Sequence, residues 1–172
     1  MTPAEMNGDI CRAAMAMAIE AHHGQTDKSG MPYFHHVWFV ANRAVDFVVA
    51  DNRIRAFAAG LLHDVVEDGH RTIEQVNAAC GPRVALAVDY LSYDKEDRGE
   101  TRQDYIARLA GDDIARAVKL ADLEHNMDLG RLDTATGKIR QRDYDRAQRY
   151  VDEYAFLLKE HIRRRFGHWV KA

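Results

Sequence analysis

Residues 61–69 (LLHDVVEDG) bring one imidazole and three carboxylates into a short stretch of chain. On a helix, residues four apart share a face, so His63 is expected beside Glu67, and Asp64 beside Asp68. Crowded carboxylates repel one another unless a cation neutralises them, and a buried carboxylate without a partner is costly. Because leucines precede this pair and valines follow it, we expect His63 and Asp64 to be buried and to bind a divalent metal ion. A solvated acidic helix end with an isolated histidine is the alternative.

Two other regions supply further ligands. His35 and His36 begin a long apolar stretch, and only one of them can point inward because neighbours on a helix point in different directions. Asp122 lies among apolar residues, where it either binds the ion or pairs with a neighbouring basic side chain at the surface. Asn126 follows one turn later on the same face. Two imidazoles and two carboxylates, with water in open positions, favour Mn²⁺, with Zn²⁺ or Fe²⁺ as alternatives.

The elements that must position these residues are helices. The chain has 3 prolines, and apolar residues recur at intervals of three and four, which predicts an all-α fold. A loop at 25–32 contains the Gly, Ser and Pro typical of a defined turn. The charged stretch 92–103 lacks an apolar face and is expected to be a mobile surface segment. The expected helices cover residues 4–23, 33–49, 53–66, 72–81, 83–91, 104–109, 114–129 and 138–166.

Length and composition limit the classes of function. A chain of 172 residues predicts a single domain spanning 1–172, and a formal net charge of −3 argues against nucleic acid as the main partner. Cys11 and Cys80 form no short-spacing motif, and no apolar run resembles a signal peptide or a membrane span. We therefore expect a cytoplasmic protein without a membrane partner. The oligomeric state is left open.

Three segments together resemble a known family. AHHGQTDKSGMPYFHH at 21–36, LLHDVVED at 61–68 and VKLADLEHN at 118–126 are similar, in this order, to HD-domain hydrolases of the RelA/SpoT alarmone family, particularly its small hydrolase-only members. The resemblance extends over residues 15–126. It implies an all-helical HD-domain bundle and a manganese-dependent reaction that removes the 3′-pyrophosphate from guanosine tetra- and pentaphosphate.

The resemblance also implies roles for individual residues, motif by motif. The implied metal ligands are His36, His63, Asp64 and Asp122. The implied catalytic pair, which positions and activates water, is Glu67 and Asp68. The implied substrate contacts are Lys28 and Ser29 for phosphate, Asn126 in the substrate pocket, and Arg146 with Tyr150 closing that pocket.

The sequence departs from the family pattern at two places. Asp27 stands where members commonly have an arginine that stacks on guanine. The acidic side chain either accepts hydrogen bonds from a base edge or tolerates a different purine. Guanine and adenine nucleotides both stay open as substrates. Leu123 and Glu124 replace the Arg-Leu of the long enzymes, which indicates a divergent branch, and no synthetase domain is expected.

These observations favour a metal-dependent phosphohydrolase that converts (p)ppGpp or (p)ppApp to pyrophosphate and GDP, GTP or the adenosine equivalents. One alternative keeps the site but acts on another phosphomonoester, such as the 2′-phosphate of NADPH. The other alternative is a non-catalytic nucleotide-binding module. Glu67 and Asp68 argue against that module, because two extra carboxylates beside bound phosphates would only weaken binding.

Overall fold

The chain folds as a bundle of helices, as predicted. The computed structural model describes residues 3–93, 98–132 and 139–167, and this part contains helices and one isolated bridge, between Thr26 and Pro32, but no strand. None of the helices in this part is long and apolar enough to cross a membrane. The α-helices are α1 (Pro3–Ala21), α2 (Phe34–Ala44), α3 (Arg53–Leu62), α4 (Ile73–Cys80), α5 (Pro82–Leu91), α6 (Arg102–Leu109), α7 (Asp113–Met127) and α9 (Gln141–Phe166).

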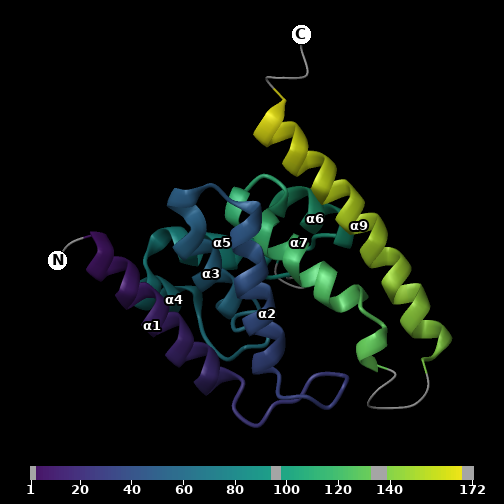
Figure 1. Cartoon of the computed structure of the whole chain (residues 1–172), viewed down its shortest axis with the longest axis horizontal. Helices are drawn as coiled ribbons and strands as arrows, with labels where there is room; N and C mark the ends of the chain where they lie inside the picture. Colours follow the sequence, from purple (N-terminus) through teal and green to yellow (C-terminus); the bar gives the residue numbers. More distant parts are fainter. Residues whose placement is uncertain (1–2, 94–97, 133–138, 168–172) are drawn as a thin grey trace.

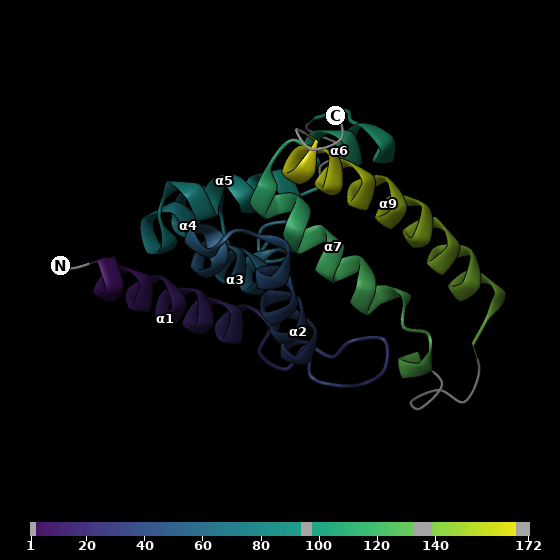
Figure 2. The ribbon, with the colours of Figure 1, turned by 45° about the horizontal axis from the view of Figure 1, so that its top comes forward.

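Helix α3 lies at the centre of the bundle. It packs against α1, α2, α5 and α7, while the long helix α9 packs against α7 along one side of the molecule (Figures 1 and 2). Most buried side chains of α3 are small, which lets the neighbouring helices approach closely; they are Ala56, Ala58, Ala59, Gly60, Leu61 and Leu62. The residues that follow α3 are therefore held between α2 and α7.

Gly60 marks the closest approach of two helices. A Cβ at this position would lie 2.5 Å from Ala41 Cα and 2.9 Å from Ala41 N, so α2 would have to move away. We expect Gly60→Ala to lower the free energy of unfolding by about 1–3 kcal/mol, measured by urea denaturation. Gly8→Ala on α1 is the matched control, since, among the described residues, a Cβ there would meet only side-chain atoms of Arg12, at 3.6 Å or more. Equal stability of the two variants would contradict this close crossing.

Helix α3 ends earlier than predicted. It stops at Leu62 in place of Val66, and residues 63–69 form successive turns. The turns are closed by backbone hydrogen bonds from Asp68 N to Asp64 O (2.9 Å) and from Gly69 N to Val66 O (3.0 Å), and Gly69 has a φ of 75°. The prediction that residues 63–68 share faces of a regular helix was therefore wrong, and the left-handed conformation of Gly69 ends the turns.

Helix α2 is also shorter than predicted. It continues only as the 3-10 helix η1 (Val45–Phe47), and Val48 adopts an extended backbone (φ −116°, ψ 162°). Consecutive β-branched residues weaken helix preference here. A second 3-10 helix, η2 (Ala50–Asn52), then leads into α3.

Residues 98–103 are anchored to the bundle. Thr101 and Asp104 form a capping box, so α6 begins at Arg102, before the predicted residue 104. Glu100 pairs with Arg108 at 2.7 Å, and Arg102 makes two 2.9 Å hydrogen bonds to Glu153 of α9. This part of the predicted mobile segment is thus fixed by ion pairs that its sequence alone does not reveal, while 94–97 lies outside the described residues.

Candidate metal centre

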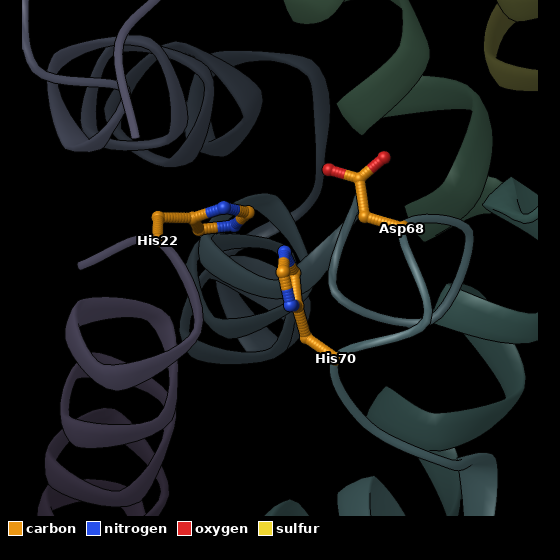
Figure 3. A group of neighbouring side chains, drawn as sticks. All are labelled: His22, Asp68 and His70. Carbon is orange, nitrogen blue, oxygen red and sulfur yellow. The ribbon is translucent and has the colours of Figure 1, made fainter. Parts of the chain in front are cut away.

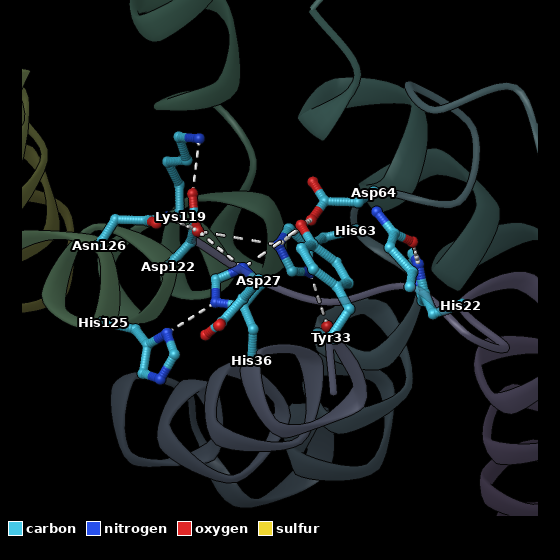
Figure 4. A network of polar contacts seen from close by, with 12 residues as sticks. His22, Asp27, Tyr33, His36, His63, Asp64, Lys119, Asp122, His125 and Asn126 are labelled. Carbon is cyan, nitrogen blue, oxygen red and sulfur yellow. Dashed lines mark hydrogen bonds and ion pairs between the residues drawn. The ribbon is translucent and has the colours of Figure 1, made fainter. Parts of the chain in front are cut away.

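Four predicted ligands converge from three separate regions of the chain. His36 comes from the first turn of α2, His63 and Asp64 follow α3, and Asp122 comes from α7 (Figure 4). His36 Nε2 lies 3.3 Å from Asp122 Oδ1, and His63 Nε2 lies 3.0 Å from Asp64 Oδ2. The two crossed distances, from His36 to Asp64 and from His63 to Asp122, are both 3.8 Å. Ligand atoms with metal bonds of about 2.0–2.2 Å have this spacing around a single ion.

The orientation of His63 fits a metal ligand. Its Nδ1 lies 2.8 Å from Gly60 O, so Nδ1 carries a proton and donates it, and Nε2 faces the cluster. Nε2 is buried and lies 3.0 Å from Asp64 Oδ2. Burial lowers the pKa of His63, but Asp64 and Asp122 outweigh it and raise the value to about 9. A metal ion would replace that proton.

The two aspartates are held ionised. Burial raises the pKa of each, but His63 beside Asp64 and Lys119 beside Asp122 bring both below the usual range. Tyr33 donates its hydroxyl hydrogen to Asp64 Oδ2. Two negative charges at the centre balance a divalent cation.

Asp122 combines the two roles that the sequence left as alternatives. Lys119 Nζ lies 2.7 Å from its Oδ2, while Oδ1 faces the histidines and accepts a hydrogen bond from Asn126 Nδ2 at 2.5 Å. The ion pair is buried, with 12% and 7% of the Lys119 and Asp122 side chains exposed. The alternative of an ion pair at the surface is therefore wrong in its location, because the pair with Lys119 is buried, and this pairing leaves Oδ1 available for a metal.

His125 supports the cluster from behind and was missed by the sequence analysis. Its Nδ1 lies 2.7 Å from His36 Nδ1. Burial, His36 and Arg131 lower the pKa of His125 to about 4, so the neutral ring accepts the His36 Nδ1 proton and directs His36 Nε2 toward Asp122. His125 and Tyr33 lie inside the LEHN and PYFHH motifs, and this position in the sequence is the signal that could have identified them.

The choice between the neighbouring histidines follows from burial. His36 is 4% exposed and lies in the cluster, whereas His35 is exposed. We expect His36→Ala to lose bound metal and His35→Ala to retain it, measured as metal per chain by inductively coupled plasma mass spectrometry after desalting. Loss of metal in the His35 variant, or its retention in the His36 variant, would reverse this assignment.

A cavity of about 390 Å³ opens beside the cluster. Basic side chains from the 26–28 loop, from the residues after α7 and from α9 surround the acidic groups, an arrangement that suits phosphates. Burial and nearby Arg146 lower the pKa of Lys28. The lining residues are Thr26, Asp27, Lys28, Tyr33, His36, Asp64, Glu67, Asp68, Arg102, Lys119, Asp122, Asn126, Asp128, Arg131, Leu132, Arg146 and Tyr150.

Asp27 and Ser29 organise the loop that borders the cavity. Asp27 Oδ1 accepts hydrogen bonds from Ser29 N (2.9 Å), Ser29 Oγ (2.6 Å) and Met31 N (3.0 Å). Its other oxygen lies 3.1 Å from Arg131 Nη2. Ser29 is not among the lining residues, and its hydroxyl points at Asp27.

Glu67 and Asp68 lie at the edge of the cavity. Glu67 Oε2 accepts a hydrogen bond from Tyr93 N at 3.0 Å, which ties this carboxylate to the segment that follows α5. Burial raises the pKa of Glu67 despite that hydrogen bond. A carboxylate with a raised pKa is a better proton acceptor near neutral pH.

Helix α9 closes the far side of the cavity with Arg146 and Tyr150, which lie one turn apart as predicted. Tyr154 of α9 donates a hydrogen bond to Glu124 Oε1 at 2.7 Å, and Arg43 Nε donates to Glu124 Oε2 at 2.6 Å. Glu124 thus joins α2, α7 and α9. This glutamate, which departs from the family pattern, therefore helps to hold α9 over the cavity.

The structure is an all-helical bundle that gathers two imidazoles and two aspartates, a candidate metal centre, beside a cavity of about 390 Å³. The family model for the HD domain matches residues 14–103, which include His36, His63 and Asp64. The chain therefore belongs to the HD domain family.

Curated relatives confirm the resemblance stated from the motifs. The chain is 37% identical over 126 residues to the "Probable guanosine-3′,5′-bis(diphosphate) 3′-pyrophosphohydrolase" of Synechocystis, covering 69% of this chain and 16% of that protein. It is 33% identical over 126 residues to the "Bifunctional (p)ppGpp synthase/hydrolase SpoT" of Escherichia coli K12, covering 67% and 17%. The matched part is thus about one sixth of the length of these relatives.

A solved structure matches over nearly its whole length. It is described as "A metazoan ortholog of SpoT hydrolyzes ppGpp and plays a role in starvation responses". The TM-score is 0.65 with 26% sequence identity, and the match covers 96% of this chain and 98% of that chain. The chain therefore shares its fold with that structure over nearly its whole length.

Proposed function

We propose that this chain is a metal-dependent hydrolase that removes the 3′-pyrophosphate from a purine nucleotide alarmone, (p)ppGpp or (p)ppApp. The products are pyrophosphate and GDP, GTP or the adenosine equivalents. The observation that carries the proposal is the four-ligand cluster at the edge of a cavity that also contains Glu67, Lys28 and Arg146. The full-length likeness to a ppGpp-hydrolysing structure supports it.

His36, His63, Asp64 and Asp122 would hold the ion. When bound, a divalent cation neutralises phosphoryl oxygens and lowers the pKa of a coordinated water. The two carboxylates, together with coordination positions left for water, favour Mn²⁺, with Zn²⁺ and Fe²⁺ as alternatives. Tyr33, Lys119 and His125 hold these ligands in place, so the centre needs little rearrangement to bind an ion.

The reaction joins a water oxygen to the phosphorus that bears the ribose 3′-oxygen, and the bond from that phosphorus to the 3′-oxygen breaks. Glu67 accepts the water proton at its carboxylate, and neighbouring Asp68 relays a proton toward the leaving 3′-oxygen. Lys28 and Arg146 neutralise charge that accumulates on the phosphates. Tyr150 and Asn126 border the space for the rest of the nucleotide.

The contacts of Asp27 suggest a role in the loop beside the base contact expected from the sequence. Both carboxylate oxygens are engaged, one by Ser29 and Met31 and the other by Arg131. We propose that Asp27 and Ser29 shape the loop that presents Lys28, and that Asp27 orients Arg131 at the cavity wall. Guanine and adenine alarmones remain equal candidates. The partner is a small nucleotide rather than nucleic acid or a membrane. The chain that binds it is proposed to be a single cytoplasmic domain.

The test supplies purified protein with Mn²⁺ and, separately, with guanosine tetraphosphate, adenosine tetraphosphate and NADPH. We expect pyrophosphate from at least one alarmone and no orthophosphate from NADPH, measured by ion chromatography. Orthophosphate from NADPH would support a phosphomonoesterase instead. Alarmone binding without any product would support a non-catalytic nucleotide-binding module.

A further inference from the structure

A second group of metal-ligand side chains lies outside the cluster described above. His22 follows the end of α1, whereas Asp68 and His70 belong to the turns between α3 and α4. One ligand atom from each of these residues lies within 4.8 Å of the other two, and the side chains face a common space (Figure 3). Two distant segments of the chain thus offer two imidazoles and a carboxylate to one place.

His22 is the buried member and presents an unused lone pair. Its Nδ1 lies 2.7 Å from Gln25 Oε1, so Nδ1 donates its proton to that oxygen and Nε2 is left as an acceptor. The residue is 4% exposed, and Nε2 has no hydrogen-bond partner in the part of the chain that the structure describes. A buried polar atom without a partner is destabilising and calls for a donor or a cation. The ring of His70 lies edge-on to His22, with centroids 5.6 Å apart.

The other two members are exposed on a firmly held backbone. His70 N and Arg71 N both donate to Val65 O at 2.9 Å, which fixes the turn that carries Asp68 and His70. Within the described residues, neither side chain of this pair makes a hydrogen bond or ion pair. Both can therefore rotate toward His22 without breaking an existing interaction.

We propose that His22, Asp68 and His70 form a second divalent metal site, of the zinc type, on the rim of the cavity. Zn²⁺ favours imidazole nitrogen and carboxylate oxygen, and three protein ligands leave one position for water. Zinc ligands at about 2.0–2.1 Å lie roughly 3.4 Å apart, so the exposed side chains would close in by about 1 Å.

The site would join the end of α1 to the turn that carries the predicted catalytic pair. Asp68 also lines the cavity, so an ion bound through one of its carboxylate oxygens would leave the other oxygen for the proposed proton relay and Glu67 as the proton acceptor. This second site does not depend on the proposed hydrolysis, because it is inferred from the positions of its three side chains and not from any substrate.

Zinc stoichiometry tests the proposal. Protein saturated with Zn²⁺ and desalted is expected to carry two ions per chain, and His70→Ala one, measured by inductively coupled plasma mass spectrometry. His23→Ala is the matched control, since His23 is an exposed histidine next to His22 and is expected to leave both ions in place. One ion in the wild-type chain, or two in His70→Ala, would overturn the second site.

A second pair of variants assigns the ions to their sites. In a His63→Ala or His36→Ala background, which removes the first centre, one zinc ion is expected to remain and to disappear when His70→Ala is added. Zinc is also expected to raise the melting temperature of the His63→Ala or His36→Ala variant, but not that of the same variant with His70→Ala added. Retention of zinc in the double variant would contradict the assignment, whatever the hydrolytic activity.

Discussion

His63→Ala is expected to abolish tight binding of the first metal ion and hydrolysis together. The variant removes one of the two imidazoles at the centre, the one whose buried Nε2 faces Asp64 and Asp122. Changing residues that merely support a metal ligand costs about 10–100-fold in affinity, so losing a ligand should cost more. The measurements are Mn²⁺ content after dialysis, by mass spectrometry, and the rate of pyrophosphate release with Mn²⁺ added back.

His161→Ala provides a matched control for losing a buried histidine. His161 is 8% exposed and contacts the ring of Phe47, and it is not among the residues that line the cavity. This variant is expected to keep its Mn²⁺ content and its turnover when measured below its unfolding temperature. Full metal content in His63→Ala would show that the ion binds elsewhere.

Glu67→Gln is expected to keep the metal and lose turnover. The amide has the shape of the carboxylate and its oxygen can still accept the Tyr93 N–H, but it cannot accept a proton at neutral pH. General-base catalysis is worth about 10²–10⁴-fold, and we expect kcat to fall by that factor while metal content and the melting temperature stay unchanged. Stopped-time assays of pyrophosphate at saturating nucleotide measure this loss.

The pH dependence gives a separate signature of Glu67. Only the ionised carboxylate accepts a proton, and burial raises its pKa, so wild-type activity should decline on acidification at a higher pH than an ordinary glutamate would give. This acid limb should vanish from the residual activity of Glu67→Gln. Glu74→Gln, at a fully exposed position on α4, is the control and should preserve both the rate and the acid limb. Unchanged kcat in Glu67→Gln would reject the role of this carboxylate.

Much of the metal centre could be predicted because its residues lie in short motifs. A histidine and an aspartate side by side between apolar pairs indicate burial, and burial of an aspartate requires a partner, which led to His63 and Asp64. The local backbone was harder to predict: the apolar run through Val66 suggests a longer helix, but the chain forms turns after Leu62, with Val65 N bonded to Leu62 O at 3.2 Å. The predicted helical face was wrong, whereas the four predicted metal ligands do lie together.

The surroundings of the centre depend on contacts between residues far apart in the chain. Asp27 reads as a base contact in isolation, but 104 positions separate it from Arg131, the residue it binds. The same is true of Arg102 with Glu153, which turned a charged and apparently mobile segment into a fixed wall. Local pattern gives no information on such pairs, because either partner alone looks like a solvated surface charge.

The course of the reaction in ¹⁸O-labelled water is the most direct test of the proposed function. Wild-type protein is loaded with Mn²⁺ and supplied with guanosine or adenosine tetraphosphate, and the products are analysed by mass spectrometry. Attack on the phosphorus next to the ribose 3′-oxygen predicts one ¹⁸O in pyrophosphate and none in the nucleoside diphosphate. Orthophosphate, label in the nucleoside diphosphate, or no product from either nucleotide would contradict hydrolysis of the 3′-pyrophosphate.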